Sequence, residues 1–336
     1  MMRSLQENVQ LQVALVYDIV NCGPHNRFVA NGKLVHNSGG DGANFQNLPR
    51  GGALRRAMKA PDGYAVVACD SSNVEARMLA YLAGEKKLLK LFKNGADVYS
   101  AFATAVFGRP INKHDNPKER FVGKTCILGL GYGTGAKKLQ HTLKMGGNPI
   151  DLDEAKRIVD LYRSEYACIP ALWRQCQDAL GRVFGGWVEH VTSINLEFGS
   201  KGILLPNGLR IQYPELAREQ GEFDFDYSYR YKNRRAKIYG GKITENIVQA
   251  TARIAVTEQM EMIRKHLDAR NRRLADGKIR RVVHFVHDEV VAIVPEDEVE
   301  DTTKMMMTIM STPPSWAPGL PISCDADSGK SYGDAK

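Results

Sequence analysis

The sequence predicts an α+β fold, and three features of the chain point to it. Residues 85–182 place apolar side chains at helical spacing along most of their length. Two apolar, valine-rich runs, at residues 65–69 and 281–294, have the length and composition of buried strands. Residues 1–37 alternate polar and apolar side chains, as short strands do. We therefore expect a helical stretch in the middle of the chain and strands on both sides of it.

Length and composition place the chain among soluble globular proteins. The 336 residues are enough for one large domain or for two to three smaller ones, and 43% hydrophobic with 25% charged residues is ordinary. No apolar run approaches the length of a membrane span, and the N-terminus lacks the layout of a secretory signal. The six cysteines show neither metal-site nor disulfide spacing, so we expect reduced thiols and a cytoplasmic protein without a membrane partner. The net charge of +8 favours a polyanionic partner.

The N-terminal segment ends in His36 and Asn37, followed by Ser38, and these three residues suggest a self-cleavage chemistry. The side-chain amide of Asn37 can attack its own carbonyl carbon and cleave the chain as a succinimide. His36 can supply the proton, and the Ser38 hydroxyl can receive an acyl group. The tripeptide alone is common, so this interpretation depends on the pattern around it.

That pattern resembles the C-terminal splicing blocks of inteins, and it is carried by residues 16–20, 25–28 and 31–37. The resemblance implies that Asn37 cyclises with help from His36. It further implies that His25 supports proton transfer and that Ser38 accepts the acyl group. The N-terminal splicing blocks are missing from the sequence, so the resemblance is to the C-terminal fragment of a split intein, spliced in trans. A decayed relic or a truncated gene is the alternative.

The strand predicted at residues 65–69 delivers Asp70 to its carboxyl end, and a polar turn leads into a helical pattern that starts at Val74. A carboxylate in this place can hold a hard cation over a substrate phosphate, or it can simply cap the following helix. Arg55 and its basic neighbours precede this strand. They can contact a phosphate backbone, although a solvated surface fits them equally well.

The most informative helix is expected to start near residue 116. Asn116 is the expected N-cap, Pro117 the first helical residue, and Glu119 follows three residues after the cap. This combination is a strong helix start.

Along the same helix, Arg120, Lys124 and Leu128 recur every four residues, and their face drifts towards Tyr132. Two cations, an apolar group and an aromatic ring on one face can bind a triphosphate and stack on a base. A helix with a solvated basic edge and a core tyrosine is the alternative. Three glycines speak against that alternative, because each costs a helix roughly 0.5–1 kcal/mol relative to alanine unless something approaches the backbone or the helix moves. They are Gly123, Gly129 and Gly131.

Three further segments can be assigned from their patterns. Residues 151–180 are expected to form an amphipathic helix of the scaffold, and residues 187–213 to form strands or hairpins. Residues 243–267 are expected to form a long helix. On it, Gln249 and Arg253 lie one turn apart, where they can reach a nucleic-acid groove or merely face water.

Residues 281–294 predict two apolar strands that meet at His287 and Asp288. A carboxylate at the tip of a buried hairpin is costly unless it is paired or binds a metal. Asp288 beside Asp70 would provide two carboxylates able to bridge two Mg²⁺ ions. A solvent-exposed turn is the alternative. The tail from residue 313 onward is expected to pack as irregular chain.

Taken together and in this order, three motifs resemble those of the family A DNA polymerases, the type of bacterial DNA polymerase I and phage replicases. The motifs are residues 70–77, then Arg120-x3-Lys124-x7-Tyr132-Gly133, then residues 287–289. The resemblance runs from residue 38 to about residue 332 and covers the C-terminal half of such an enzyme. It implies a palm, made of an antiparallel sheet with helices, and helical fingers. The implied domains are an all-β intein fragment at 1–37, the first part of the palm at 38–84, the fingers at 85–182 and the second part of the palm at 183–336.

The resemblance also implies roles for the catalytic residues. Asp70 and Asp288 would hold two Mg²⁺ ions, with help from the backbone of Ser71. Arg120 and Lys124 would bind the triphosphate, and Lys124 is also the candidate proton donor to pyrophosphate.

The same resemblance assigns four residues to the nucleotide. Glu75 would exclude a ribose 2′-hydroxyl, and Tyr132 would lie under the templating base pair. Leu128 stands where bacterial members usually carry Phe or Tyr, which implies a difference in sugar discrimination and incorporation rate. Tyr99 replaces a His that usually contacts phosphate.

DNA contacts are implied for four more residues. Gln249 and Arg253 lie on the helix that follows primer-template DNA, and His287 stands in the last motif. Arg55 matches a basic position near the nascent base pair.

The implied function is primer extension by a two-metal mechanism, with primer-template DNA and dNTPs as partners. A further implied partner is an N-terminal polymerase half that carries the N-terminal intein fragment and is joined to Ser38 by splicing. Two alternatives belong to other classes. One is a two-metal nuclease, and the other is an inactive DNA-binding half with a relic intein piece.

Overall fold

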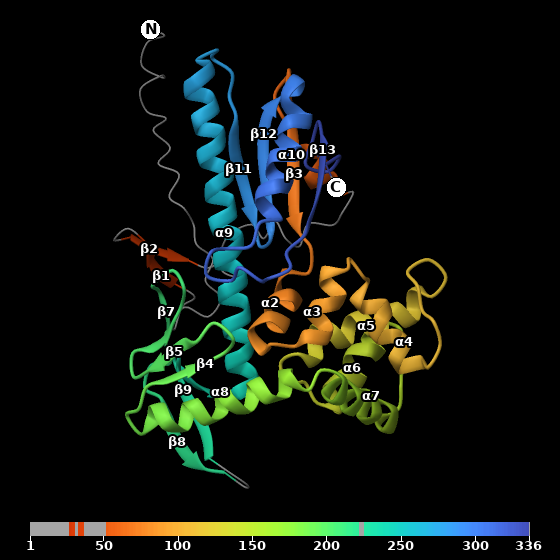
Figure 1. The fold of residues 1–336 in the computed structure, drawn as a ribbon, viewed down its shortest axis with the longest axis vertical. Coiled ribbons are helices and arrows are strands. Elements are labelled where there is room, and N and C mark those ends of the chain that lie inside the picture. Colours follow the sequence, from red (N-terminus) through yellow and green to blue (C-terminus); the bar gives the residue numbers. More distant parts are fainter. Residues whose placement is uncertain (1–26, 31–32, 37–51, 222–224, 336) are drawn as a thin grey trace.

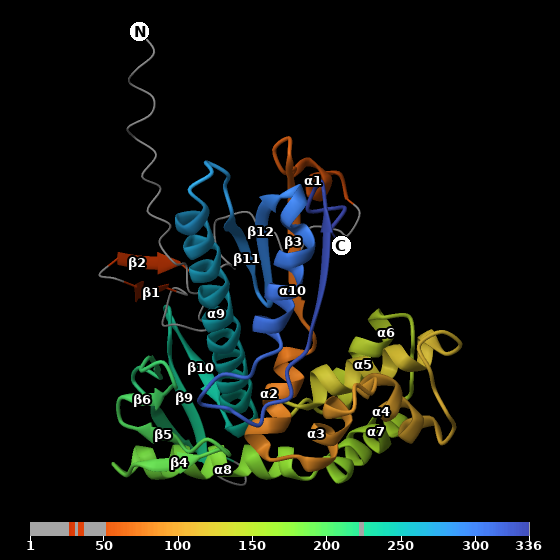
Figure 2. The same ribbon diagram turned by 45° about the horizontal axis from the view of Figure 1, so that its top comes forward.

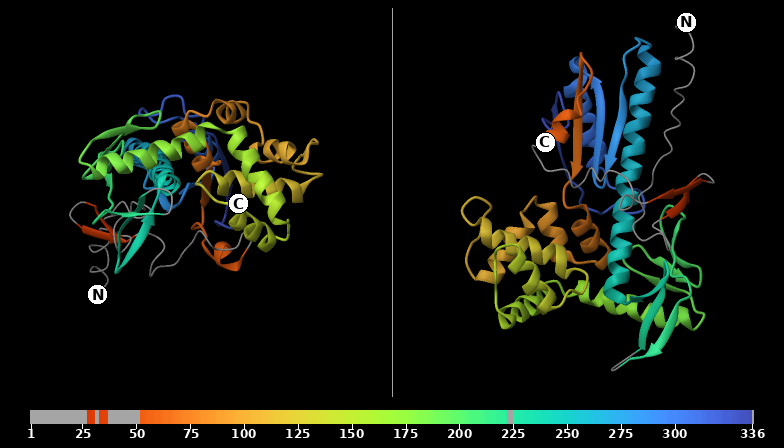
Figure 3. Two further views of the ribbon diagram at one scale, coloured as in Figure 1. Left: turned by 90° about the horizontal axis from the view of Figure 1, so that it is seen from below. Right: turned by 180° about the vertical axis from the view of Figure 1, so that it is seen from behind.

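The computed structural model describes residues 27–30, 33–36, 52–221 and 225–335. Figure 1 shows a sheet flanked by long helices, a cluster of helices to one side of it, and two small sheets at the other side. One helix, α9 (Gly240–Leu274), runs from the small sheets up along the central sheet (Figures 1 and 3). No helix in the described ranges combines the length and the apolar character needed to cross a lipid bilayer.

Four antiparallel strands form the central sheet in the order β11–β12–β3–β13. β3 (Tyr64–Ser71) is an inner strand between β12 (Glu289–Pro295) and β13 (Cys324–Gly329), and β11 (Arg281–Val286) lies outside β12. The predicted strand before Asp70 and the predicted late hairpin are therefore confirmed, and they are direct neighbours in one sheet.

The expectation of an irregular tail is wrong for β13, which pairs with β3 over six residues. Its sequence, Cys-Asp-Ala-Asp-Ser-Gly, is too polar to predict a strand. The strand forms because the backbone N–H and C=O groups on the second edge of β3 need hydrogen-bond partners, and β13 supplies them. The chain then turns back over one face of the sheet, where Tyr332 and Ala335 pack on Val66 and Ala68. Helix α1 (Ala53–Ala57) lies beside this tail (Figure 2), and the Tyr332 amide donates a hydrogen bond to the Met58 carbonyl at 2.9 Å.

The opposite face of the sheet carries the main hydrophobic core. The side chains of Val67, Cys69 and Val290 point into it, and α9 and α10 (Val299–Met310) cover it. Alternate residues of β3 thus face two different layers, as the two-residue period of a strand requires.

The predicted helical stretch consists of several short helices beside the sheet (Figure 1). α2 (Val74–Ala83) follows β3 directly. The others are α3 (Lys86–Lys93), α4 (Val98–Phe107), α5 (Pro117–Leu130), α6 (Ala136–Met145), α7 (Leu152–Glu165) and α8 (Cys168–Phe184).

The closest pair in this cluster is α4 and α5. A side chain at Gly123 would overlap the backbone carbonyl oxygen of Tyr99, so glycine permits the two helix backbones to approach. The predicted start of α5 is confirmed in position, with Asn116 at the N-cap and Pro117 first in the helix. The capping hydrogen bond is absent, because the side-chain oxygen of Asn116 accepts the amide of Asn112 instead, at 3.3 Å.

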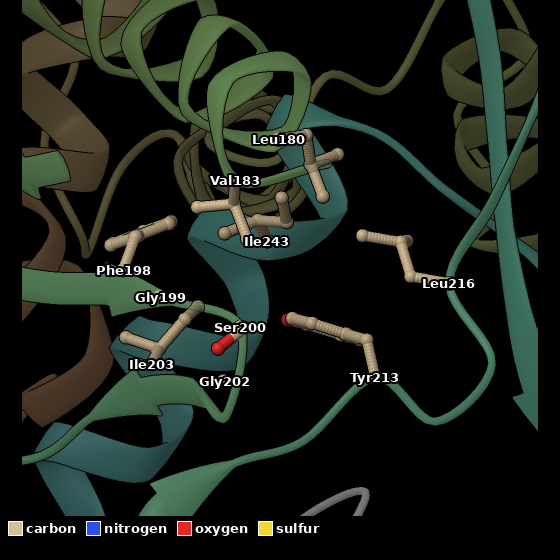
Figure 4. Close-up of a pocket in the computed structure, with 10 residues that line it drawn as sticks. All are labelled: Leu180, Val183, Phe198, Gly199, Ser200, Gly202, Ile203, Tyr213, Leu216 and Ile243. Carbon is tan, nitrogen blue, oxygen red and sulfur yellow. The ribbon is translucent and has the colours of Figure 1, made fainter. Parts of the chain in front are cut away.

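Two small antiparallel sheets lie between α8 and α9 in the sequence. The first agrees with the hairpins expected at residues 187–213 and contains β4 (Glu189–Val191), β5 (Leu196–Gly199), β6 (Gly202–Leu204) and β7 (Arg210–Ile211). The second contains β8 (Ala217–Gln220), β9 (Phe225–Tyr231) and β10 (Arg234–Ile238). Figure 4 shows a cavity of about 50 Å³ where the first sheet meets α8 and α9, with Leu180, Ile203 and Ile243 in its wall. Its mostly apolar lining marks it as a packing gap.

The N-terminal segment is described only in part. β1 (Arg27–Ala30) and β2 (Lys33–His36) pair as antiparallel strands, which agrees with the short strands expected in this segment. His36 ends β2, whereas His25, Asn37 and Ser38 lie outside the described residues. The splicing assignments and the domain boundaries therefore stay predictions.

Candidate active site

The end of β3, the start of α2, the exposed face of α5, the middle of α9 and the turn between β11 and β12 enclose one cleft with a cavity volume of about 780 Å³. Most of the polymerase-site residues that the sequence resemblance implies line it. They are Asp70, Ser71, Glu75, Tyr99, Arg120, Lys124, Leu128, Gln249, Arg253, His287 and Asp288.

Asp70 and Asp288 enter this cleft from neighbouring strands. Asp70 is the residue before the last of β3, and Asp288 lies in the turn between β11 and β12. The Ser71 amide donates a hydrogen bond to the Asp288 carbonyl at 2.9 Å, and Asp70 pairs with Glu289 in the β-ladder. The two carboxylates that are far apart in sequence therefore line one cleft from neighbouring strands.

Asp70 has an acidic neighbour on each side. Glu289, opposite it on β12, is 3% exposed and accepts a hydrogen bond from the Tyr332 hydroxyl at 2.9 Å. Asp325, opposite it on β13, also lines the cleft and accepts a hydrogen bond from the Ser72 hydroxyl at 2.9 Å. The sequence analysis missed Asp325, because its strand was not recognised.

The carboxylates of the cleft suit Mg²⁺, which water and substrate phosphates help to bind, better than a metal ion bound by protein side chains alone. In the described part of the chain, no group of three or more His, Cys, Asp or Glu side chains forms a metal cluster. Mg²⁺ keeps several waters and is usually bound by one or two carboxylates together with substrate phosphates. Asp70 and Asp288 supply that number of carboxylates.

Arg120 is held by an acidic partner on the edge of the cleft. Its Nε and Nη2 atoms donate to the two carboxylate oxygens of Asp97, at 2.5 and 3.2 Å. Burial opposes ionisation of Asp97, but hydrogen bonds from Arg120 and Ser100 outweigh it and hold the pKa of Asp97 below its ordinary value. Lys124 lies one turn further along α5, and both cations line the same cleft as the carboxylate pair.

Tyr99 connects this cation to the turn after β3. Its ring lies under the Arg120 guanidinium, 5.2 Å from centroid to Cζ, and its hydroxyl donates to the side-chain oxygen of Asn73 at 2.5 Å. Burial raises the pKa of Tyr99, so the hydroxyl stays a donor at neutral pH. The residue that replaces the expected His is therefore a bridge between α4, α5 and α2.

Glu75 lines the cleft and forms a hydrogen bond with Tyr132, which is not among the residues that line it. Burial raises the pKa of Glu75, the charges of Asp288 and Glu245 raise it further, and the hydrogen bond to Tyr132 opposes them. Burial also raises the pKa of Tyr132 well above its ordinary value. Leu128 on α5 is 43% exposed and adds an apolar side chain to the lining of the cleft.

Helix α9 contributes Gln249 and Arg253 to the lining of the cleft. The Nη1 atom of Arg253 donates to the His287 carbonyl at 2.7 Å, and its guanidinium lies 3.9 Å from the centroid of the Phe285 ring. His287 has a left-handed backbone conformation, with φ of 51°.

Arg55 does not reach the cleft. It is 5% exposed and its guanidinium lies over the Tyr332 ring, 4.8 Å from the centroid. The predicted contact of Arg55 with DNA does not fit this position, because a buried guanidinium cannot reach a nucleic-acid surface. Its burial follows from the C-terminal tail folding back over α1, which the sequence did not indicate.

Comparison with known proteins places these features in a family. The family model "DNA polymerase family A" matches residues 25–334. The chain is 31% identical over 288 residues to the DNA polymerase of Bacillus phage SP02, covering 81% of this chain and 42% of the phage protein. It is 30% identical over 287 residues to DNA polymerase I of Chloroflexus aurantiacus, covering 84% of this chain and 26% of that protein. The chain thus spans less than half the length of these relatives.

A solved structure shares the fold. The POL domain of Pol1 from M. smegmatis, in complex with DNA primer-template and dNTP, superposes with a TM-score of 0.64. The two chains are 22% identical, and the match covers 87% of this chain and 45% of the other. The mixed α/β arrangement described above is therefore a polymerase fold.

Proposed function

The chain belongs to DNA polymerase family A, and we propose on this premise that it is the catalytic part of a DNA-directed DNA polymerase. The observation that carries the proposal is the cleft itself. Asp70 and Asp288 line it together with the cations Arg120 and Lys124 of α5. Primer-template DNA and dNTPs are the partners that this arrangement fits.

In the proposed reaction, the residues of the chain bind and orient the substrates. Asp70 and Asp288, with the backbone of Ser71, would hold two Mg²⁺ ions. The chemistry that these ions supply when bound is activation of the primer 3′-hydroxyl and neutralisation of charge on the departing pyrophosphate. Arg120 and Lys124 bind the triphosphate, and Lys124 donates a proton to the leaving group.

The remaining cleft residues select the nucleotide and follow the DNA. Glu75, held by Tyr132, occupies the space that a ribose 2′-hydroxyl would need. Leu128 and Tyr132 pack against the base pair, and Gln249 and His287 contact the primer-template. Selection by shape and by hydrogen-bonded contacts of this kind is worth several kcal/mol in a closed site.

The deciding experiment is primer extension by the chain assembled with its N-terminal half. Asp70→Asn and Asp288→Asn should each lower the rate of nucleotide incorporation by about 10³-fold or more, because each removes a metal-binding charge. Asp153→Asn, on the exposed surface of α7, is the matched control and should leave the rate unchanged. Normal incorporation by either active-site variant would rule out the proposed site.

A two-metal nuclease is the competing activity, since it also uses paired aspartates. The cationic face of α5 favours the polymerase, because hydrolysis needs no helix that binds a triphosphate. Incubation with an end-labelled primer, template and dNTPs separates the two activities, since the polymerase lengthens the primer and the nuclease shortens it.

We further propose that residues 1–37 are the C-terminal fragment of a split intein that joins the N-terminal half to Ser38 in trans. The sequence pattern supports this, and the β1–β2 hairpin ends at His36, next to the proposed cleavage position. The family match begins at residue 25 and so overlaps this fragment, which makes a direct test necessary.

The test of splicing mixes the chain with its N-terminal half and follows the products on a denaturing gel. A ligated product should form, and Asn37→Ala should block release of that product. Unchanged splicing by the Asn37→Ala variant would contradict the assignment, and absence of any ligated product would favour the relic.

A further inference from the structure

The turn that carries Asp288 is held by hydrogen bonds to both of its carbonyl groups. The His287 carbonyl accepts the Nη1 hydrogen of Arg253 at 2.7 Å. The Asp288 carbonyl accepts the amide of Ser71 at 2.9 Å. The peptide groups before and after Asp288 are therefore both fixed, one by α9 and the other by β3, and the carboxylate keeps only its own side-chain rotations.

Arg253 is well placed to fix the turn, because it is itself immobilised. Its Cζ atom lies 3.9 Å from the centroid of the Phe285 ring on β11, a cation–π contact that sets the plane of the guanidinium. Its backbone belongs to the middle of α9, which packs against the core along most of its length. The Nη1 atom of Arg253 is therefore oriented towards the backbone of the turn.

The backbone conformation of the turn makes this restraint necessary. His287 is in the left-handed region, with φ of 51°, where a non-glycine residue persists only if its surroundings hold it there. A hydrogen bond from a cation to a carbonyl is stronger than one between neutral groups. The bond from Arg253 is therefore a suitable restraint for a conformation that the sequence alone does not favour.

We propose that Arg253 is a positioning residue, which fixes the His287–Asp288 turn and thereby the direction of the Asp288 carboxylate. This inference rests on the proposed function, because it assigns the purpose of the restraint to the metal site. It replaces the expected contact of Arg253 with DNA. In the structure the guanidinium lies on Phe285 and donates to a carbonyl, and a phosphate contact would compete with this hydrogen bond.

The test uses Mn²⁺ as a probe for the carboxylate pair, titrated into the full 336-residue chain and followed by electron paramagnetic resonance. Arg253→Met keeps the length of the side chain and its contact with the ring but removes the donor. It should weaken Mn²⁺ binding about tenfold, as the loss of a residue that orients a metal ligand commonly does. Arg253→Lys keeps a donor and should stay within about threefold of the unmodified chain, a partial rescue that a purely structural role would not give.

Two controls bracket this measurement. Arg273→Met, exposed near the far end of the same helix, should leave Mn²⁺ binding unchanged. Phe285→Leu removes the ring but keeps the donor, and it should weaken binding less than Arg253→Met does. If Arg253→Met fails to fold, as judged by circular dichroism, Arg253→Lys is compared with the unmodified chain instead. A loss of Mn²⁺ affinity beyond about threefold in Arg253→Lys would then overturn the proposal.

DNA binding provides the second readout. Loss of a phosphate contact would lower the slope of log K against log salt by about 0.9 for primer-template DNA. A reduced slope with unchanged Mn²⁺ affinity in Arg253→Met would overturn the proposal and restore the DNA contact. Unchanged slope and unchanged Mn²⁺ affinity would overturn it as well.

Asp288→Asn separates this inference from the proposed function. If Asp288→Asn binds Mn²⁺ as tightly as the unmodified chain, the metal site itself is wrong. If Asp288→Asn weakens Mn²⁺ binding and Arg253→Met does not, the metal site stands and only the positioning role of Arg253 fails.

Discussion

Two non-glycine residues beside the carboxylate pair have left-handed backbones, Asn73 with φ of 55° and His287 with φ of 51°. Such conformations cost about 1–3 kcal/mol for a single residue. Each is matched by a hydrogen bond from a residue further away in the sequence, from Tyr99 to the Asn73 side chain and from Arg253 to the His287 carbonyl. The two sharp turns beside the cleft are thus each stabilised by a side chain from another helix. Tyr99 and Arg253 are also residues for which the sequence predicted a contact with substrate or DNA.

Glu75 gives a prediction at the same scale. Its pKa is raised in the folded state by burial and by the charges of Asp288 and Glu245. A carboxyl group with a raised pKa favours the folded state at low pH and loses that contribution as pH rises through the folded pKa. In metal-free buffer near neutral pH, Glu75→Gln should therefore raise the Tm of the chain by about 2 °C.

The pH dependence provides the check on this prediction. Below about pH 4 the Glu75 carboxyl is protonated in both states, so the two Tm values should converge. Glu219→Gln, exposed on β8, is the control and should leave Tm unchanged at both pH values. A Glu75→Gln variant less stable than the unmodified chain at neutral pH would contradict the sign.

Helices α4 and α5 hold Tyr99, Arg120 and Lys124 in one arrangement, and their spacing depends on one glycine. A methyl group at Gly123 would overlap the Tyr99 carbonyl oxygen, which belongs to the backbone and cannot turn away. Gly123→Ala should therefore lower the free energy of unfolding by about 1–3 kcal/mol, as overpacking does. Denaturant unfolding followed by circular dichroism measures the change.

Gly129 on the same helix is the matched control. No atom lies within 4 Å of a methyl group at this position, so Gly129→Ala gains helix propensity without a clash. It should raise the free energy of unfolding by about 0.5–1 kcal/mol. Equal effects of the two substitutions would show that contact between α4 and α5 is not the cause.

The connection from α9 to β11 depends on a buried ion cluster. Arg280 is 0% exposed and donates to Glu298 Oε2 at 2.8 Å and to Asp276 Oδ2 at 2.7 Å. Arg280→Met leaves the Glu298 carboxylate with Arg270 as its partner, and it should lower the free energy of unfolding by about 1–3 kcal/mol. Arg182→Met, which breaks the exposed pair with Glu189, should cost less than about 1 kcal/mol in the same urea titration.

The elements that the sequence predicted are those with a strong pattern of their own. β3, the β11–β12 hairpin and α9 have apolar runs or helical periodicity, and they bring Asp70, Gln249 and Asp288 to the cleft. β13 and the β8–β10 sheet were missed, because their strands are rich in charged and polar residues and are specified by their neighbours. Asp325 was missed for the same reason, and the burial of Arg55 depends on the same C-terminal tail.

At the scale of the whole molecule, the chain spans less than half the length of the relatives it matches. The relatives are more than twice as long as the part that matches, with 42% of the phage protein and 26% of the Chloroflexus protein covered. DNA affinity depends on the number of phosphate contacts, so a partial enzyme holds DNA weakly at physiological salt. Under the proposed function, the cleft carries the chemistry, and an N-terminal half would supply most of the contacts to the duplex.

This gives a prediction for processivity. Residues 38–336 alone should add only a few nucleotides per binding event, whereas the enzyme joined to its N-terminal half should extend further. Primer extension in the presence of excess trap DNA measures the product length from a single encounter. Equal product lengths would show that the described half is sufficient for DNA binding.

The order of the strands in the central sheet determines when that sheet can form on the ribosome. β3 is synthesised early, but both of its neighbours come much later, and Ser72 meets Asp325 across 253 positions of sequence. At about 5–20 residues per second, the nascent valine-rich strand waits on the order of 10–50 s before its second edge is covered. During that interval its backbone is an open template for pairing with other chains. Production of this protein in a foreign host should therefore improve with slower growth or with extra chaperones that shield emerging β-segments.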